Sequence, residues 1–513
     1  MFLEVKNAAL VNMGHENKIA EISFDISWNK AWKNEVNCDG AWIFAKYRID
    51  KGQWHHVNLL GDSGCMFDYE DHTPSGFSKG MLKSNSQIGI WVPESRKGMF
   101  LYRTEGNGDV FSEKVKILWD IEKVELTDKK RIEIKVFGIE MVYIPEGRHY
   151  VGDPMGPKGP RNCLYTYPDG GAYLIDSEKS IEVAPKEGCL YCNQDSPYSR
   201  DEEAYIIPEE FPKGYKAMWY MKYSLTCKQY VDFLNTLTRK QQQSRVASDI
   251  SGDFIENYYV MTNTNTEFER QAVFCRREGN GTDKPIQFYT NAPQRACNVT
   301  SWGDLTAYAC WSGLRPITEL EFEKAARGTA EPVPSEFAWG TTNIGRVFNF
   351  DGPDGSGHEK KIPENGLVNC NFGTGIAPFE KDTRTESRNP GWVGPVSVGL
   401  FANSWDEAYS ERENSGASFY GVMEMCGNVW EQLISTGKAE GRKFKPVHGT
   451  GDLDEDGNAN VSEWPSPFTG DGGGVRGGVF VSPEPVYLIM AFRGFAANSQ
   501  PKRRFHGGIR VGF

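Results

Sequence analysis

The residues with the clearest capacity for chemistry lie in one acidic loop, GDLDEDGNANVSE, from Gly451 to Glu463. If Asp452 is position 1, then Asp454, Asp456 and Glu463 take positions 3, 5 and 12 of an EF-hand calcium loop, with a glycine at position 6. Carboxylates this close repel one another unless a cation or water absorbs their charge. The spacing therefore predicts a calcium site, and a solvated acidic turn is the alternative. The predicted ligands are Asp452, Asp454, Asp456, Asn458 and Glu463.

The flanks of this loop differ from those of an EF-hand. An EF-hand loop lies between two helices, whereas GRKFKPVHGT precedes this loop and WPSPFTGDGGGVRGG follows it. Proline and glycine exclude a helix on either side. We expect the loop to act as a structural brace for the last strands of the chain and not as a calcium sensor.

Cysteine and histidine give weaker signals. The 11 cysteines are an odd number without a repeated metal spacing, so at least one is unpaired unless it is bonded to another chain. Cys189 and Cys192 form a lone CxxC, for which core thiols or a local disulfide are favoured over zinc binding or redox use. His55 and His56 lie on opposite faces of an expected strand, which favours surface and packing roles over a shared metal.

Length and charge exclude several classes of protein. A chain of 513 residues predicts two units, or one domain with large insertions. The net charge of −12, without a basic run, argues against nucleic acid and against an anionic membrane surface as partners. No stretch of 18 apolar residues and no signal peptide is visible, so we expect no membrane span. If the chain is a mature form, an extracellular or cell-surface location is favoured.

Residues 1–135 are expected to form an all-β, sandwich-like domain. Apolar and polar residues alternate in short runs that Gly, Asn and Asp turns separate, as in strands with one buried face. The runs are AEISFDISW, GAWIFAKYRI, QWHHVNLL, IGIWVP, GMFLYR and VKILWDI.

The pattern changes from Met141 onward, where helices become visible. SLTCKQYVDFLNTLTRKQ carries apolar residues at helical spacing behind a cap at Thr226. TSWGDLTAYACWSGL is the second expected helix, and ITELEFEKAARG the third, with Thr318 as the cap, Glu321 as the capping-box acid and Gly328 as the stop. Beyond residue 330 we expect loops and short strands with almost no helix.

The order of these segments resembles the formylglycine-generating enzyme, or sulfatase-modifying factor, family. MVYIPEG is similar to its opening strand, NVTSWGDLTAYACWSGLRPITELEFEKAARG to its central helices, GVMEMCGNVWEQ to its Gly-Asn-Val-Trp-Glu segment, and VRGGVF and GGIRVGF to its closing strands. The resemblance covers residues 138–513 and implies a loop-rich, C-type-lectin-like α+β fold.

The family's oxidase chemistry is not implied for this chain. That chemistry uses two cysteines, five residues apart near the final strand, to hold copper(I). No cysteine follows Cys426 here, and the two positions fall at or near Tyr487 and Phe492. No histidine cluster suits the iron-dependent relatives either. We therefore expect no bound copper and no catalytic residue, with an oxidase acting on protein cysteine as the alternative.

The resemblance also implies a structural calcium ion. Its ligands in GVMEMCGNVWEQ would be the carboxylates of Glu424 and Glu431 and the carbonyls of Gly427 and Val429. A turn closed around a buried Trp430 is the alternative. A second calcium site of the family cannot be placed, because residues 369–395 carry an apparent insertion.

The segment from residue 479 to 506 is the predicted ligand-binding face, since aromatic residues and arginine dominate binding hot spots. Its candidates are Phe480, Glu484, Tyr487, Met490, Phe492, Arg493, Phe495, Lys502, Arg503, Arg504, Phe505 and His506. Variable proteins of diversity-generating retroelements place their changeable segment similarly. We predict a non-catalytic, adhesion-type protein that binds a protein or glycan. A structural component of a surface or secretion apparatus is another alternative. About half of the aromatic residues are expected to pack in the terminal sheet whatever the function, because strand side chains alternate in direction. The oligomeric state stays open.

Overall fold

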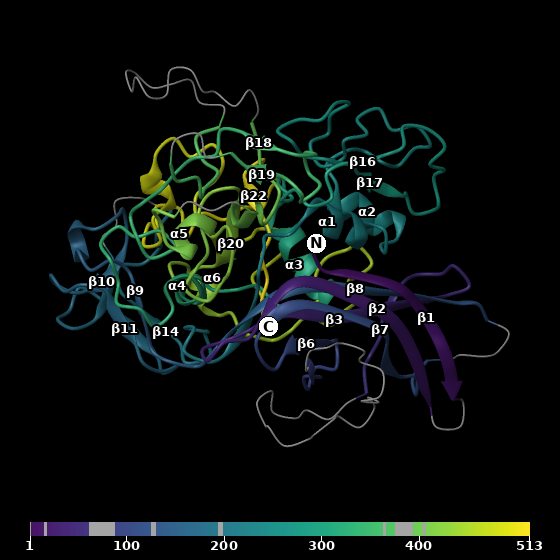
Figure 1. The fold of residues 1–513 in the computed structure, drawn as a ribbon, viewed down its shortest axis with the longest axis horizontal. Helices are drawn as coiled ribbons and strands as arrows, with labels where there is room; N and C mark the ends of the chain where they lie inside the picture. The colour runs from purple at the N-terminus through teal and green to yellow at the C-terminus, as the bar shows by residue number, and fades with distance from the viewer. Residues whose placement is uncertain are drawn as a thin grey trace.

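The computed structural model describes residues 2–14, 18–60, 88–124, 130–192, 198–362, 366–374, 393–403 and 407–513 (Figure 1). Strands are numerous and short in the second half of the chain, and helices are few, which confirms the predicted α+β class. The N-terminal strands are β1 (Glu4–Gly14), β2 (Ile19–Trp32), β3 (Asp39–Ile49), β4 (His55–His56), β5 (Ile88–Trp91), β6 (Met99–Arg103), β7 (Asn107–Asp120) and β8 (Ile132–Ile144).

Two facing sheets make up the N-terminal region, as predicted. One has the order β1-β2-β7; the other has the order β15-β8-β3-β6-β5, where β15 is Met218–Met221. In Figure 1 these strands run together at one side of the molecule. Alternate residues of β2, such as Ile22, Phe24 and Ile26, are buried between the sheets because strand side chains alternate in direction. The alternation of the sequence therefore produces the sandwich.

The second sheet is shared between the two regions of the chain. Strand β8 pairs with β3 from residue 132 to 142 and with β15 through its last residues, so the predicted boundary between residues 135 and 138 falls inside β8. The outer face of this sheet packs on the helices: the rings of Phe44 and Trp311 lie 5.0 Å apart, and the indole of Trp42 donates to the carbonyl of Ser312 at 2.8 Å. The sandwich is thus continuous with the rest of the core.

Helices begin where the capping residues predict. Thr226 and Thr318 each accept from the backbone N–H three residues later, with Gln229 and Glu321 closing the capping boxes. The first predicted helix is divided in two, because Thr238 starts a new capping box with Gln241. The helices are α1 (Cys227–Leu234), α2 (Arg239–Arg245), α3 (Trp302–Ser312), α4 (Glu319–Arg327), α5 (Glu411–Ser415) and α6 (Ala439–Arg442), with 3-10 turns η2 (Gly156–Lys158), η3 (Leu400–Asn403) and η4 (Pro485–Leu488).

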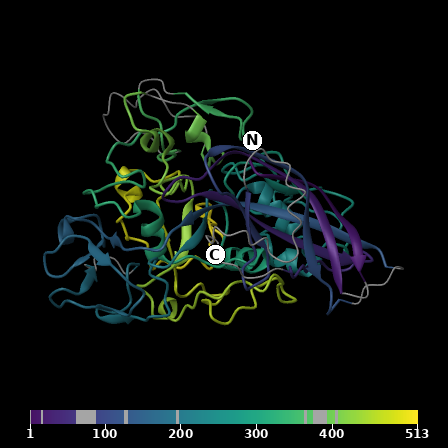
Figure 2. The same ribbon diagram turned by 60° about the horizontal axis from the view of Figure 1, so that its bottom comes forward.

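Small sheets occupy the remainder, as Figure 2 shows for the blue strands at the edge of the molecule. Their strands are β9 (His149–Val151), β10 (Leu164–Thr166), β11 (Tyr173–Ile175), β12 (Ile181–Val183), β13 (Leu190–Cys192), β14 (Tyr205–Ile207), β16 (Val273–Cys275), β17 (Phe288–Thr290), β18 (Phe350–Asp351), β19 (Lys360–Lys361), β20 (Trp430–Ile434), β21 (Gly473–Arg476) and β22 (Gly507–Gly508). In the ranges given above, no helix is long and apolar enough to cross a membrane.

The predicted cysteine and histidine pairs carry no metal arrangement. Cys189 and Cys192 are free thiols, so the local disulfide considered for them is not formed. His55 is exposed and His56 is buried, which confirms their opposite directions. Among all described residues there is no group of three or more His, Cys, Asp or Glu that could hold a metal ion.

A buried ionic network joins α4 to the C-terminal segment. Glu319 lies 2.7 Å from Arg493 Nε and 3.2 Å from Arg476 Nη1, and it also accepts from the backbone N–H of Thr436 at 2.7 Å. Arg476 reaches Glu323 at 2.7 Å. Burial raises the pKa of Glu319, but the ion pair with Arg493 and the other contacts outweigh this effect and hold the pKa at about 2.

Replacing Glu319 by Gln should lower the free energy of unfolding by about 3–5 kcal/mol, since it leaves the buried guanidinium of Arg493 without its carboxylate and removes one of the two carboxylates paired with Arg476. The folded pKa lies below the ordinary value of 4.5, so this contribution is present above pH 4.5 and is lost as the pH falls toward 2. Urea unfolding of the parent protein and of Glu319→Gln, measured between pH 7 and pH 2.5, should show that the difference between their free energies of unfolding becomes smaller as the pH falls. Glu331→Gln, at an exposed position, is the control and should change little; an equal loss in both variants contradicts the assignment.

Candidate ligand-binding site

The C-terminal segment is held between the strands of one small sheet. β20 pairs with β21 on one side and with β22 on the other, and residues 477–506 leave β21 and return to β22. Gly477 and Gly478 begin this excursion with φ of 85° and 73°, a backbone conformation that favours glycine. A Cβ at Gly478 would lie 3.0 Å from the carbonyl of Tyr487, so the turn brings the segment back over the sheet.

Aromatic rings surround a pocket of about 250 Å³ in this segment. The ring centroids of Tyr487 and Phe492 are 5.3 Å apart, those of Phe492 and Phe495 are 6.0 Å apart, and Trp430 lies 5.8 Å from Phe495 and 4.8 Å from His506. Tyr487 and Phe492 are the two residues predicted to replace the thiols of the oxidase. The pocket therefore lies where those thiols are expected, and no cysteine lines it.

His506 supplies the polar group of the pocket. Its Nε2 atom is buried and has no hydrogen-bond partner among the described residues. Burial, and next the charge of Arg504, lower the pKa of His506 to about 4, so the imidazole is neutral at physiological pH. Aromatic walls beside an unpartnered imidazole nitrogen suit an apolar group that also carries a polar function.

A wider hollow of about 660 Å³ adjoins the aromatic pocket and shares Val481 and His506 with it. Phe268 and Phe505, which are 51% and 40% exposed, lie along it. Burial raises the pKa of Glu269, whose Oε2 atom has no partner in the described part of the chain. The two hollows together form a continuous surface that mixes apolar rings with polar groups.

The structure divides the predicted face into exposed and buried members. Phe480, Met490 and Arg493 are buried in the core, so the sequence was wrong to assign them to a surface. The guanidinium of Arg503 pairs with Asp304, in the first turn of α3, at 2.7 Å. Buried partners explain the inward direction of Arg493, because its guanidinium pairs with Glu319. The members that line a hollow are Tyr487, Phe492, Phe495, Phe505 and His506; Glu484, Lys502 and Arg504 are exposed beside them.

Sequence reasoning missed three contributors to this surface. Trp430 was considered only as a buried residue, in the alternative to a calcium site, but it is half-buried and forms one wall of the pocket. Ser482 lines the same pocket, and Phe268 comes from a loop more than 200 residues earlier. The GNVWE segment contains a signal for Trp430, since its neighbour Val429 is buried and strand alternation turns the next side chain outward. No sequence signal connects Phe268 with the C-terminal segment.

The acidic loop does not gather its carboxylates into one site. Asp452 accepts from the backbone N–H of His56 at 3.0 Å, Asp456 pairs with Lys240 at 2.8 Å, and Asp454 accepts from the N–H groups of Asp456 and Asn458. Asn458 accepts from Arg245 at 3.0 Å, and Glu463 accepts from Ser462. Calcium in this loop stays a prediction, and these contacts argue against it because side-chain cations and N–H groups already absorb the charge.

The turn from Glu424 to Glu431 has one open ligand position. Glu424 and Asn428 adopt φ of 52° and 62°, and Gly427 has φ of 75°, with its Cβ direction 2.4 Å from the carbonyl of Asn371. The Oε1 atom of Glu424 accepts from the N–H of Gly399 at 2.7 Å, while its Oε2 atom is buried without a partner in the described chain. Burial raises the pKa of this carboxyl group to about 7.

Glu431, the other predicted carboxylate ligand of this turn, already has a cation. Its carboxylate lies 2.8 Å from Arg510 Nε and accepts from the hydroxyl of Tyr220 at 2.8 Å. The guanidinium of Arg510 also donates to the carbonyl of Met423 at 2.8 Å. Glu424 therefore keeps one buried carboxylate oxygen without a partner in the described chain, whereas the carboxylate of Glu431 is already paired with Arg510.

Comparisons with known proteins agree with this fold. Residues 208–512 match the family model described as the sulfatase-modifying factor enzyme 1-like domain. A formylglycine-generating enzyme of Thermomonospora curvata is 26% identical over 147 residues, which cover 29% of this chain and 35% of that enzyme. A formylglycine-generating enzyme of Mycobacterium tuberculosis is 30% identical over 157 residues, which cover 31% of this chain and 38% of that enzyme.

The chain thus spans little more than a third of the length of these curated relatives. The family model, in contrast, covers more than half of the 513 residues, including α1 to α6 and the strands that surround the aromatic pocket. The resemblance inferred from the sequence is confirmed for residues 208–512, which include all of the quoted segments except MVYIPEG and the final Phe513 of GGIRVGF. From residue 208 onward the chain belongs to the sulfatase-modifying factor enzyme 1-like family.

Proposed function

We propose that this chain is a non-catalytic, adhesion-type member of its family, which binds a protein or glycan at the aromatic pocket and the adjoining hollow. The observation that carries the proposal is the ring of Trp430, Tyr487, Phe492 and Phe495 around the unpartnered Nε2 atom of His506. Aromatic rings supply large contact areas at a small entropic cost, and exposed apolar patches of this kind are typical of interaction surfaces.

The support for a non-catalytic role is chemical. Thiolates are the soft ligands that copper(I) requires, and aromatic rings cannot replace them. The thiol nearest in sequence, Cys426, donates to the carbonyl of Leu488 at 3.1 Å beneath the segment, and burial raises its pKa to about 12. A thiol with such a pKa is protonated at neutral pH and is a poor metal ligand or nucleophile.

Variation of the segment by a diversity-generating retroelement is a finer form of this proposal. It predicts a near-identical copy of the DNA that encodes residues 479–506 close to the gene, differing only where the copy has adenine. The residues free to vary would be those that line the hollows or lie exposed, while Arg493 would stay constant because it is bound to Glu319.

Binding should depend on the rings of the pocket. Arrays of glycans and of surface-protein fragments should yield a ligand, and Tyr487→Ala and Phe495→Ala should each weaken its affinity at least about tenfold, as for central residues of an interface. Phe468→Ala is the matched control, since Phe468 is 71% exposed and lines neither hollow. Surface plasmon resonance measures the affinities. Equal affinities for all four proteins would place the binding site elsewhere.

The oxidase alternative predicts copper chemistry that we expect to be absent. Titration with copper(I) in competition with a chelator should show no stoichiometric binding, and incubation with a cysteine-containing peptide and oxygen should leave the cysteine unchanged. Conversion of the cysteine to an aldehyde contradicts a non-catalytic role. If copper does bind, Cys426→Ser shows whether the thiol beneath the pocket holds it.

We also propose a structural calcium ion at the turn from Glu424 to Glu431, supported by the unpartnered, buried Oε2 atom of Glu424. Calcium should raise the melting temperature by mass action, and a chelator should reverse the rise. Because the pKa of Glu424 is about 7, protons compete with the ion, and the rise should be larger at pH 8 than at pH 6.

Two matched variants separate the candidate calcium sites. Glu424→Gln should abolish the rise in melting temperature, whereas Glu463→Gln, in the acidic loop, should retain it. The opposite pattern would place the ion in the acidic loop. A melting temperature that does not respond to calcium in the parent protein would exclude both sites.

A further inference from the structure

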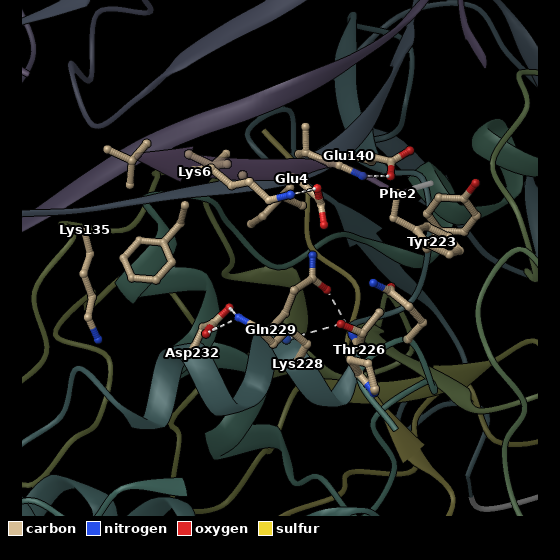
Figure 3. A pocket seen from close by; sticks show the side chains of 18 of the residues that line it. Phe2, Glu4, Lys6, Lys135, Glu140, Tyr223, Thr226, Lys228, Gln229 and Asp232 are labelled. Atoms are coloured by element: carbon tan, nitrogen blue, oxygen red, sulfur yellow. Dashed lines mark hydrogen bonds and ion pairs between the residues drawn. The ribbon is translucent and has the colours of Figure 1, made fainter. Parts of the chain in front are cut away.

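A second cavity, of about 710 Å³, lies between β1, β8 and helix α1, and it shares no lining residue with the aromatic pocket or the hollow beside it. Figure 3 shows β1 passing above it, with the side chains of Lys228, Gln229 and Asp232 rising from α1 below. Its volume is within the range of ordinary ligand sites. The family's chemistry and the predictions from the sequence assign nothing to it.

Two strand edges line one part of this cavity, and side chains of α1 and of the core line the rest. Every residue from 2 to 8 and every residue from 134 to 140 borders it. The face of a strand would contribute only alternate residues, because side chains alternate in direction. Among the residues that the structure describes, β1 pairs only with β2, and β8 pairs only with β3 over residues 132–140, so both strands have an edge without a partner strand there. The cavity is therefore a groove along strand edges.

The hydrogen-bonding groups of β8 point into this groove. Ala45 of β3 is opposite Val136 of β8. The carbonyl of Ala45 accepts from the N–H of Val57, on the other side of β3, at 3.0 Å, and therefore points away from β8. In an antiparallel pair of this kind the main-chain groups of both residues point outward, which directs those of Val136 away from β3. Glu140 has the same parity, and its carbonyl accepts from the N–H of Lys222 on that outer side at 3.0 Å.

Three residues of the free edge carry these groups: Ile134, Val136 and Gly138. Within the described ranges, no hydrogen bond is formed by their outward N–H and C=O groups. A row of such groups is a template for an added strand. The stretch from Ile134 to Gly138 is roughly 15 Å long, which matches a segment of about five extended residues.

Charged side chains lie above and below the free edge. On the β1 side, Lys6 and Glu4 are paired at 2.5 Å, and on the α1 side Lys228 and Asp232 are paired at 2.5 Å. Lys135 also borders the groove; its Nζ atom lies 3.4 Å from the carbonyl of Asn235 and 4.9 Å from the centroid of the Trp54 ring, and burial lowers its pKa. The α1 side thus holds two lysines and one aspartate, an excess of positive charge that an acidic side chain would balance.

We propose that this groove binds an extended polypeptide segment of a partner protein, which pairs as a strand with the free edge of β8 and directs an acidic side chain toward Lys135 and Lys228. Main-chain hydrogen bonds to Ile134, Val136 and Gly138 supply affinity, and the charges above and below select polar side chains at alternate positions. Gln229, whose amide points upward into the groove in Figure 3, can bond the same segment.

Selection from a phage-displayed library of linear dodecapeptides on the full chain tests this proposal. Selected peptides, synthesised with a fluorophore and measured by anisotropy, should share an extended pattern with an acidic residue. Val136→Pro removes one outward N–H without breaking the β3 ladder and is expected to weaken binding at least about tenfold, whereas Val136→Ala, which keeps that N–H, should bind normally. Lys135→Gln should weaken binding about twofold to fivefold.

A second measurement keeps the test decisive if Val136→Pro fails to fold. Two methylated forms of a selected peptide are compared, one with methyl groups on the amide nitrogens of its odd-numbered residues and one on those of its even-numbered residues. One form should lose binding and the other should keep it, because only one of the two sets of N–H groups faces β8. The proposal is overturned if the two methylated peptides bind with equal affinity, or if Val136→Pro and the parent chain bind the unmodified peptide equally. So does a library that yields no binder, or a chain that dimerises through this edge and excludes all peptides.

Discussion

The buried carboxylate of Glu319 is the constraint on which the C-terminal half of the molecule depends. It lies at the start of α4, and its partners come from β21, from the segment after η4 and from the end of β20. A buried charge is tolerated only when it is paired and hydrogen-bonded, so these elements can assemble only with Arg476 and Arg493 directed inward. With Arg493 fixed inward, the neighbouring rings of Phe492 and Phe495 are positioned around the pocket.

The same rule explains why the acidic loop differs from an EF-hand. Its aspartates already have partners, because Lys240 of α2, the main chain of β4 and the loop's own N–H groups approach them. Nearby, the buried ammonium of Lys46 in β3 donates to the carbonyls of Trp311 and Gly451. The loop therefore braces the molecule, as its position suggested, but what it joins is the family domain and the N-terminal sheet.

Local patterns in the sequence predicted local structure well. Alternation located β2, β3 and part of β7, although it missed β1 and the first residues of β8. The pairs Thr226 with Gln229 and Thr318 with Glu321 marked helix starts, since a capping box depends on residues three positions apart. The candidate site was harder to predict. Arg493 and Arg504 are the same residue type in one segment, yet only Arg493 is buried, because it pairs with Glu319. Glu319 lies 174 positions earlier, so no local pattern reveals this pairing. Phe268 joins the same surface from a loop that no local pattern connects to it.

Strand β8 shows why the N-terminal sandwich and the family domain form one structural unit. Its last residues pair with β15 of the family domain, while its first residues pair, within the described part of the chain, only with β3 of the sandwich. One strand therefore has a closed outer edge where the family domain begins and an open one just before it. Extending β15 to cover the open edge would displace α1, whose capping box at Thr226 begins five residues after β15 ends. The groove is thus a direct consequence of how the family domain is joined to the sandwich.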